Sequence, residues 1–332
     1  MAALTGVPLS VLDRSRTRVG ETEAETLRAT VELAQQVEEL GYKRFWVSEH
    51  HSVPGVVGSA PTVLAAAVAA RTSRIRVGTG GVMLPNHQPL VVAEQFGVLE
   101  SLYPGRIDMG LGRSVGFTNG IRRALGVEKD ATEDFAAQVR ELLAYLAGTQ
   151  QNQVHARPGE GLHIPPFILA VGEGAAIAAS LGLPVVLAAR SESQVLATLD
   201  EYRTSFQPSA WAPEPYVILA VTAAVADTTE AARQILLPEA WASAYSRTRG
   251  VFPPLQADVP SEMTAREQEF VENGLRGQIY GTPDEVDTAL GGLVRRTAVD
   301  EVLITTNTYD RADLLASYAA LAELALPVDA RL

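Results

Sequence analysis

Short apolar runs alternate with amphipathic helical patterns along almost the whole chain, and this alternation constrains the fold more than any other feature. Eight runs have the length and apolar content of buried strands: Leu9–Leu12, Phe45–Ser48, Ile75–Thr79, Ile107–Gly110, Phe167–Val171, Val185–Ala188, Val217–Thr222 and Glu301–Thr305. Strands that alternate with helices form parallel sheets, because each helix returns the chain to the same edge. Eight such units in 332 residues predict an α/β fold, a (β/α)8 TIM barrel that forms a single domain over residues 1–332.

Two helices carry clear start signals. Thr22 and Glu25 have the spacing of a capping box ahead of an apolar periodic stretch, and Gly41 stands where that helix should end. Thr282 and Glu285 repeat the pattern around a first-turn proline. Both patterns favour helices that cover a barrel.

Two segments do not match any barrel element. The segment 149–165 is polar and contains two prolines, and the segment 247–278 contains Pro253, Pro254 and Pro260 around a short helical pattern. We expect both to be insertions over the carboxyl-terminal mouth of the barrel, the second as a mobile cover. The composition does not shift along the chain in a way that would indicate a second domain.

An open doubly wound sheet is the alternative α/β architecture. It requires a glycine-rich phosphate turn after its first strand. Here the polar residues 13–16 follow the first strand, and the Gly110-Leu111-Gly112 sequence has Val115 where the third glycine belongs. The barrel is therefore the favoured interpretation.

The charge of the chain limits its partners. Lys and Arg number 27 against 39 Asp and Glu, which gives a net charge of −12. Such a surface repels phosphate backbones and anionic lipids, so we expect no nucleic-acid or membrane partner. The chain has no Cys, which excludes disulfides, Cys-ligated metals and a thiol nucleophile.

The apolar stretch Pro165–Ala189 raises the question of a membrane span. Gly172, Gly174, Gly182 and Pro184 divide it into a strand, a short helix and a second strand. The N-terminus also lacks the basic and apolar regions of a secretory signal, so we expect a cytoplasmic protein.

The loops after the strands locate the candidate site, because a TIM barrel carries its reacting groups there. His50 and His51 end the second strand, where an imidazole can exchange a proton near neutral pH. Strand alternation allows only one of them to face the cavity. A loop histidine bonded to backbone is the alternative, and Glu49, His50 and His51 are too close in sequence to converge on a metal, so we expect no metal site.

Glycines and an arginine follow the third and fourth strands. Gly80 and Gly81 indicate that a flat or bulky group approaches the backbone, or else that the strand bends at the barrel corner. Arg113 is suited to clamp an anion such as phosphate, although a surface ion pair would equally explain it.

Several motifs occur together in a characteristic order: residues 45–51 (FWVSEHH), 76–87 (RVGTGGVMLPNH), 89–96 (PLVVAEQF), 103–108 (YPGRID) and 110–113 (GLGR). In this order and spacing the chain resembles the bacterial-luciferase-like flavin monooxygenase family, over about two-thirds of its length. The resemblance implies a (β/α)8 barrel in which reduced FMN, supplied by a separate NAD(P)H:flavin reductase, reacts with O2 to give a flavin hydroperoxide that oxygenates an organic substrate. The pattern is similar to the branch found in natural-product, including polyketide, biosynthesis.

The resemblance also assigns roles to individual residues. It implies that His50 is the catalytic acid, base or hydrogen-bond donor near the flavin. Gly80 and Gly81 match the dipeptide with a cis peptide bond beneath the flavin ring, and Arg113 matches the arginine that holds the flavin phosphate. The helices at 61–70 and 90–102 match the faces through which the family forms dimers, so we expect a homodimer.

The sequence departs from the family after the fifth strand. Where the family presents a Gly-Ser-Ser or similar turn to the phosphate, this chain has Gly172, Glu173 and Gly174. Backbone N–H groups at the helix start can still bind phosphate, but Glu173 opposes it if it points inward. We therefore expect weak or altered FMN binding.

Two other functions stay open at this point. One is a deazaflavin (F420)-dependent hydride-transfer oxidoreductase, since relatives on the same barrel use that cofactor. The other is a non-catalytic luciferase-like partner subunit, which the altered turn supports. For the monooxygenase we expect a mostly apolar organic substrate, because few charges lie near the strand ends.

Overall fold

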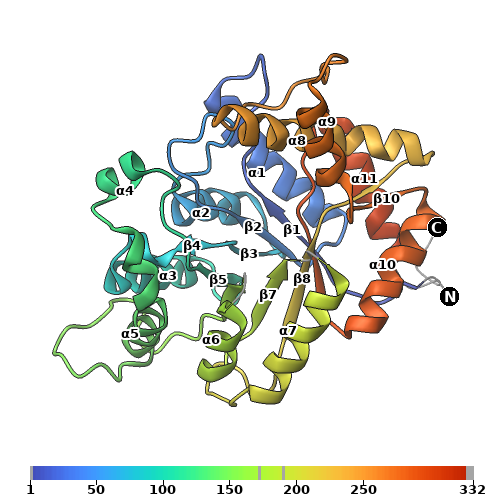
Figure 1. The fold of residues 1–332 in the computed structure, drawn as a ribbon. Helices are drawn as coiled ribbons and strands as arrows, with labels where there is room; N and C mark the ends of the chain where they lie inside the picture. Colours follow the sequence, from blue (N-terminus) through green and yellow to red (C-terminus); the bar gives the residue numbers. More distant parts are fainter. Residues whose placement is uncertain (1–2, 171–172, 189–190, 327–332) are drawn as a thin grey trace.

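The computed structural model describes residues 3–170, 173–188 and 191–326, and these form a closed barrel of parallel strands surrounded by helices (Figure 1). The barrel strands are β1 (Leu9–Asp13), β2 (Arg44–Val47), β3 (Arg76–Thr79), β5 (Ile107–Gly112), β6 (Pro166–Ala170), β7 (Val185–Ala188), β8 (Val217–Val221) and β11 (Glu301–Ile304). Pairing of β3 with β5 closes the sheet, with Val77 opposite Ile107. The predicted (β/α)8 barrel is confirmed, and Val171, predicted as the end of the fifth strand, lies outside the described residues.

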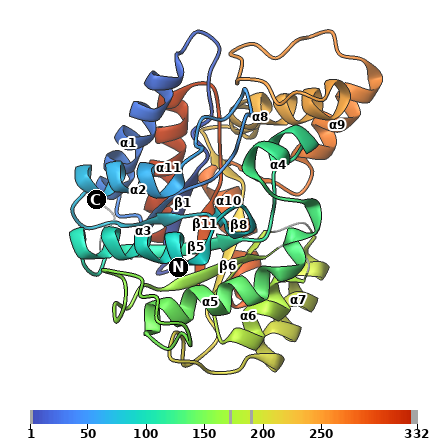
Figure 2. The ribbon, with the colours of Figure 1, turned by 90° about the vertical axis from the view of Figure 1, so that its left-hand side faces the viewer.

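Helices follow the barrel strands on the outside (Figures 1 and 2). They are α1 (Glu23–Glu39), α2 (Pro61–Arg71), α3 (Pro89–Leu102), α4 (Asn119–Leu125), α5 (Phe135–Ala147), α6 (Gly174–Leu181), α7 (Glu192–Ser205), α10 (Pro283–Thr297) and α11 (Arg311–Ala325). Both predicted capping boxes are present, at Thr22 with Glu25 and at Thr282 with Glu285. None of the described helices is long and apolar enough to cross a membrane.

The segment 149–165 does not lie over the mouth of the barrel, contrary to the sequence-based expectation. It joins the end of α5 to the start of β6, so the chain direction places it at the amino-terminal end of the strands. The Gly161 N–H bonds the Leu146 carbonyl at the end of α5, and the His163 ring stacks on Trp211, which precedes β8. The polar composition had indicated an irregular segment correctly but gave no information on which end of the barrel it occupies.

The segment over the mouth is longer than 247–278. After β8 the chain forms β9 (Ala223–Val225), α8 (Thr229–Arg249), α9 (Ala265–Leu275) and β10 (Ile279–Gly281), and β9 pairs with β10 in a small parallel sheet. Helices α8 and α9 lie side by side in Figures 1 and 2. The expected short helix is α9, whereas α8 lies almost entirely before the predicted segment. The outer helix of this barrel unit is α10, which packs between α7 and α11.

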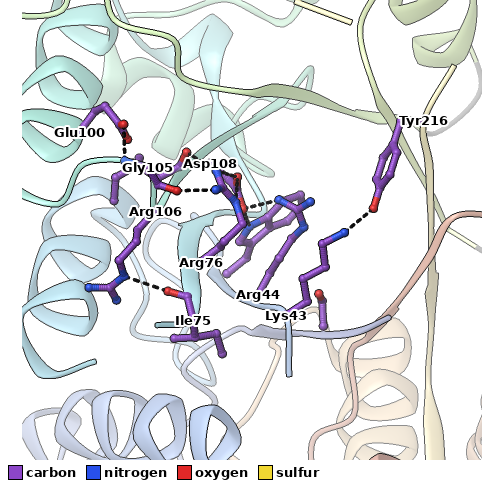
Figure 3. Close-up of polar contacts among 12 residues, drawn as sticks. Lys43, Arg44, Ile75, Arg76, Glu100, Gly105, Arg106, Asp108 and Tyr216 are labelled. Atoms are coloured by element: carbon purple, nitrogen blue, oxygen red, sulfur yellow. Dashed lines mark hydrogen bonds and ion pairs between the residues drawn. The ribbon is translucent and has the colours of Figure 1, made fainter. Parts of the chain in front are cut away.

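The barrel interior is filled in two layers. An apolar cluster lies in the middle and contains Leu12, Trp46, Phe167, Val186, Ile218 and Leu303. A network of charged residues lies at the amino-terminal ends of the strands, where Arg44 contacts Asp108 at 2.7 Å and Glu301 at 2.9 Å. Figure 3 shows Arg44 and Arg76 pointing toward Asp108, and Lys43 toward Tyr216. This network seals the end opposite the mouth.

Candidate functional site

A cavity of about 450 Å³ opens at the carboxyl ends of β2, β3, β5 and β6. It is lined by Ser48, Glu49, His50, Gly80, Gly81, Met83, Gly112, Arg113, Ser114, Thr132, Leu169 and Gly174. The structure thus brings His50, the glycine pair, Arg113 and Gly174 together, although they come from four different loops. Gly172, also predicted to bind the cofactor, lies outside the described residues.

His50 is the histidine that lines this cavity, whereas His51 does not. Its Nδ1 lies 3.1 Å from the Ser48 hydroxyl, and its ring stacks on Phe117 with centroids 6.4 Å apart. The backbone N–H of His50 donates to the Gly58 carbonyl at 2.8 Å, and this bond fixes the loop after β2. The imidazole is therefore held on one edge, and its Nε2 forms no hydrogen bond within the described part of the chain.

The pKa of His50 is lowered to about 4. Burial disfavours the imidazolium most, and the positive charges of Arg14 and Arg16 repel it as well, whereas Glu49 acts in the opposite direction. His50 is consequently neutral at pH 7. This corrects the expectation that it titrates near neutrality: it is available as a hydrogen-bonding group or proton acceptor, not as a standing cation.

Glu49 organises the loops around the cavity, a role that the sequence analysis did not assign. Its buried carboxylate lies 2.7 Å from His51 Nε2 and 2.9 Å from His87 Nε2, and it accepts the Met83 N–H at 2.9 Å. Burial raises the pKa of Glu49, but the bonds from His87, His51 and Met83 outweigh it and leave the pKa below its ordinary value. The carboxylate thus joins the loop after β2 to the segment after Gly81. The only sequence signal was its position beside His50.

Gly80 and Gly81 form the floor between the strands. Their peptide bond is cis, the conformation that the resemblance implied. A Cβ on Gly80 would lie 2.6 Å from Leu12 Cδ1, and one on Gly81 would lie 2.7 Å from the Gly110 carbonyl oxygen. Neither position has space for a side chain beneath it, so the cavity wall here is bare backbone that a planar group can approach closely.

Arg113 pairs with Glu173 across the cavity rim. Arg113 Nη1 donates to Glu173 Oε2 at 2.7 Å, with 37% of the arginine and 81% of the glutamate side chain exposed. The Glu173 carboxylate therefore binds the Arg113 guanidinium, which was expected to hold the flavin phosphate. Because such exposed pairs contribute only about 0–1 kcal/mol, an anionic ligand can displace Glu173 at small cost.

Two hydroxyl groups in the cavity had not been predicted. Ser114 follows Arg113 directly, and Thr132 lies in a short 3-10 helix at Lys129–Asp134. Both come from the segment that matches the family motifs least, so only the folded chain brings them beside Arg113. They place hydroxyl groups near the turn at 172–174, which has none; that of Thr132 donates to the Lys129 carbonyl at 3.3 Å in this structure.

A second cavity of about 350 Å³ lies at the same mouth. It is lined by Leu12, Arg14, Thr222, Leu236, Glu239, Ala240, Ser243, Gly274, Leu275, Gln278 and Thr305. The Leu12 side chain separates it from Gly80, so the two cavities adjoin. The α8–α9 segment forms most of its roof.

The segment between α8 and α9 is fixed at the mouth by the buried Arg16 and by a backbone hydrogen bond to the β1 loop. Arg16 donates to the Gly55 and Pro253 carbonyls, and its guanidinium lies 4.2 Å from the centre of the Phe252 ring. The Val19 N–H bonds the Leu255 carbonyl at 2.9 Å. The segment thus lies over the mouth, where these contacts join it to the β1 loop, and its mobility stays a prediction.

Comparison with known proteins identifies relatives along nearly the full chain. The sequence profile of the luciferase-like monooxygenase family matches residues 7–301. Uncharacterised protein YvbT of Bacillus subtilis is 41% identical over 95% of this chain and 96% of its own, and a luciferase-like monooxygenase of Escherichia coli is 34% identical over 97% of both. An N-acetyl-S-alkylcysteine monooxygenase of B. subtilis is 41% identical over a shorter region, 55% of this chain and 57% of its own.

Solved structures share the fold. The structure of apo-MsnO8 superposes with a TM-score of 0.83 at 30% identity, covering 97% of this chain and 98% of the other. The FMN complex of the oxygenating constituent of 3,6-diketocamphane monooxygenase from Pseudomonas putida gives 0.74 at 18% identity over 97% and 98%. An F420-dependent secondary alcohol dehydrogenase gives 0.72 at 13% over 95% and 98%. The last two show the barrel alone.

Proposed function

The chain belongs to the luciferase-like monooxygenase family, and we propose that it is the oxygenating component of a two-component FMN-dependent monooxygenase. In this proposal a separate NAD(P)H:flavin reductase supplies reduced FMN, O2 is the co-substrate, and an organic molecule is oxygenated at an apolar part. The observation that carries the proposal is the convergence of His50, the Gly80–Gly81 backbone and Arg113 on one cavity. The motif resemblance favours a polyketide-type natural product as one such substrate.

The cavity fits FMN. The bare Gly80–Gly81 backbone accepts a flat ring system, and Gly112, opposite Met83 on the neighbouring strand β5, also leaves the cavity wall without a side chain. Arg113 would hold the phosphate, assisted by Ser114 and Thr132 and by N–H groups at the start of α6. When bound, FMN supplies the O2-activating redox chemistry that no side chain provides.

The chain's own residues would position and protect the reacting groups. His50 is neutral, and its unused Nε2 can donate a hydrogen bond or hold a proton beside the flat ring. Phe117 stacks on the outer side of His50, and the α8–α9 segment covers the adjoining cavity. In this proposal Phe117 and the α8–α9 segment limit the entry of water. Oxygenation requires that water be excluded from the reacting groups.

Flavin oxidation in air tests the proposal. The protein is mixed with FMN, NADH and a generic flavin reductase, and oxygen consumption and peroxide release are compared with a protein-free control. We expect the wild type to prolong the lifetime of reduced FMN and to slow peroxide release. Arg113→Ala should abolish both effects, and His50→Ala should keep FMN binding but accelerate peroxide release.

Kinetics identical to the protein-free control would refute the monooxygenase proposal. Reduction of an F420 cofactor without oxygen uptake would then indicate the hydride-transfer function. Absence of binding to either cofactor would indicate a non-catalytic partner subunit.

We also propose a homodimer formed through α2 and α3. Both helices expose large apolar side chains, Val63 at 70% and Leu102 at 63%, with Val91 and Val98 about half exposed. Such a surface is typical of a protein interface. Light scattering should give about twice the chain mass of 35.4 kDa, and Val63→Glu with Leu102→Glu should give the monomer. A wild-type monomer would refute this proposal.

A further inference from the structure

The second cavity at the mouth carries its own pair of charged side chains. It adjoins the flavin cavity through Leu12 and is lined by one positive side chain, Arg14, and one negative side chain, Glu239. Thr222, Ser243, Gln278 and Thr305 add polar groups to an otherwise apolar lining. This makes it the natural place for the substrate beside the cofactor, and its polar residues determine which substrates it accepts.

Glu239 forms ion pairs with both Arg16 and Arg14, and one of these two charges is enough to balance the carboxylate. Arg16 is buried and donates from Nε to Glu239 Oε2 at 2.8 Å, while its other two nitrogens bond the Gly55 and Pro253 carbonyls. All three nitrogens of Arg16 are thus occupied. Because this guanidinium is fixed and paired, it leaves Glu239 without a net charge to present to the cavity.

Arg14 has N–H donors that no described residue uses. It reaches the other Glu239 oxygen through Nη2, and this is its one side-chain hydrogen bond among the described residues. Its Nε and Nη1 donors remain, and 27% of the side chain is exposed. Two arginines against one glutamate leave one positive charge, and that charge lies on the arginine that faces the cavity.

The location of Arg14 is close to the catalytic histidine. A Cβ on Gly58 would lie 3.4 Å from the Arg14 carbonyl oxygen, and the same Gly58 accepts the His50 N–H at 2.8 Å. The positive charge of Arg14 also contributes to the lowered pKa of His50. A group bound by Arg14 would therefore lie within one small molecule's length of the flavin cavity.

Ser243 strengthens this assignment. It lies one helical turn after Glu239 on α8, so both side chains project from the same face into the cavity. The Ser243 hydroxyl forms no hydrogen bond within the described residues and can donate to the same acceptor.

We propose that the substrate carries a carboxylate that binds Arg14, with Ser243 as a second donor, while its apolar part extends past Leu12 toward the cofactor. The planar fork of a guanidinium binds a carboxylate through two parallel hydrogen bonds. The inference rests on the proposed function for the identity of the adjoining cavity, and it narrows the substrate class from apolar molecules to small organic acids with an apolar chain.

Binding of a matched pair of probes tests this. N-acetyl-S-benzyl-L-cysteine and its carboxamide have the same size and differ in the anionic group. Their Kd values are measured by calorimetry on the full chain, without cofactor and with FMN. We expect the wild type to bind the acid at least tenfold more tightly than the carboxamide, and less so at high salt.

Variants assign the preference to Arg14. Arg14→Gln should reduce the preference to less than twofold without weakening carboxamide binding, and Arg14→Lys should retain part of it. Arg233→Gln is the matched control, because Arg233 is 26% exposed and pairs with Glu272 at 2.7 Å between α8 and α9, and neither residue lines the second cavity. The preference should be unchanged in this control.

Equal binding of the two probes, no binding of either, or a preference that survives Arg14→Gln would each overturn the inference. If the Arg14→Gln variant unfolds, Arg14→Met replaces it in this comparison, because methionine also removes the charge and keeps an apolar stem. FMN affinity is measured in parallel and should not respond to Arg14→Gln. Failure of FMN binding in the wild type would refute the proposed function and leave the acid preference as a separate result.

Discussion

Replacing Glu173 with glutamine should strengthen FMN binding. The Glu173 carboxylate pairs with Arg113, the guanidinium proposed to hold the flavin phosphate. A phosphate must therefore displace a carboxylate that belongs to the protein, and afterwards that carboxylate remains nearby as a like charge. Glu173→Gln removes both costs and keeps the shape of the side chain.

The magnitude follows from the exposure of the pair. Glu173 is 81% and Arg113 is 37% exposed, so breaking the ion pair costs less than about 1 kcal/mol. Repulsion between one negative charge and a phosphate monoester a few ångströms away in water adds about 1 kcal/mol. The sum is about 1 to 2 kcal/mol, so the Kd for FMN should fall about 5- to 30-fold.

Fluorescence titration of FMN and riboflavin measures this effect. Riboflavin lacks the phosphate, so its Kd should change less than twofold. The control is Glu272→Gln, which removes the same charge from an exposed pair with Arg233 and should leave FMN binding unchanged. If Glu173→Gln changes both flavins equally, or neither, Arg113 does not bind the phosphate and the reasoning fails.

Three further perturbations test other parts of the structure. Gly81→Ala should destabilise the fold or weaken FMN binding by about 1 to 3 kcal/mol, because its Cβ would lie 2.7 Å from the Gly110 carbonyl oxygen. Gly112→Ala, whose Cβ would lie 3.8 Å from its nearest protein atom, should have little effect on thermal unfolding. The pKa of His50 falls from its ordinary 6.5 to about 4 in the folded chain, so the free energy of unfolding should decrease as the pH falls from about 6.5 toward 4, by about 2 kcal/mol at pH 5. Denaturant unfolding of His50→Gln should show a smaller decrease over this pH range than the wild type. Equal decreases in the two proteins would contradict the lowered pKa. Glu301→Ala should lower the free energy of unfolding by about 3 to 5 kcal/mol, because the buried Arg44 then keeps only Asp108, which it shares with Arg76, and a loss below 1 kcal/mol would show that the network is not needed to seal the barrel.

The fold was predictable because its signals are local and repeat. Each strand is a short apolar run, and the two predicted capping boxes mark where their helices begin. The segment 149–165 shows the limit of this approach. Its composition indicates an irregular connection, but which end of the barrel it occupies depends on whether it precedes or follows a strand. The same limit applies to α8, whose pattern does not distinguish a barrel helix from a helix over the mouth.

The site was predictable only where its residues directly follow strands. His50, Gly81 and Arg113 satisfy that condition and line one cavity. Thr132 and Glu239 reach the mouth from helices that lie far along the chain, so no spacing rule brings them to the strand ends. The pairing of Arg113 with Glu173 required the three-dimensional structure, because a sequence shows that both charges exist but not that they meet.

Arginine–carboxylate pairs occur at both ends of the barrel, and burial gives them opposite properties. Arg44 and Glu301 are almost fully excluded from water, so a ligand cannot replace either partner without leaving a buried charge. Arg113 and Glu173 are exposed at the opposite end, where water stabilises each charge alone and exchange of partners costs little. The end that must stay closed therefore has the pair that is expensive to break, and the end that must admit an anion has the pair that opens easily. If the Arg113–Glu173 pair were buried and the Arg44–Glu301 pair exposed, the mouth would no longer exchange anions easily and the opposite end would no longer be held closed.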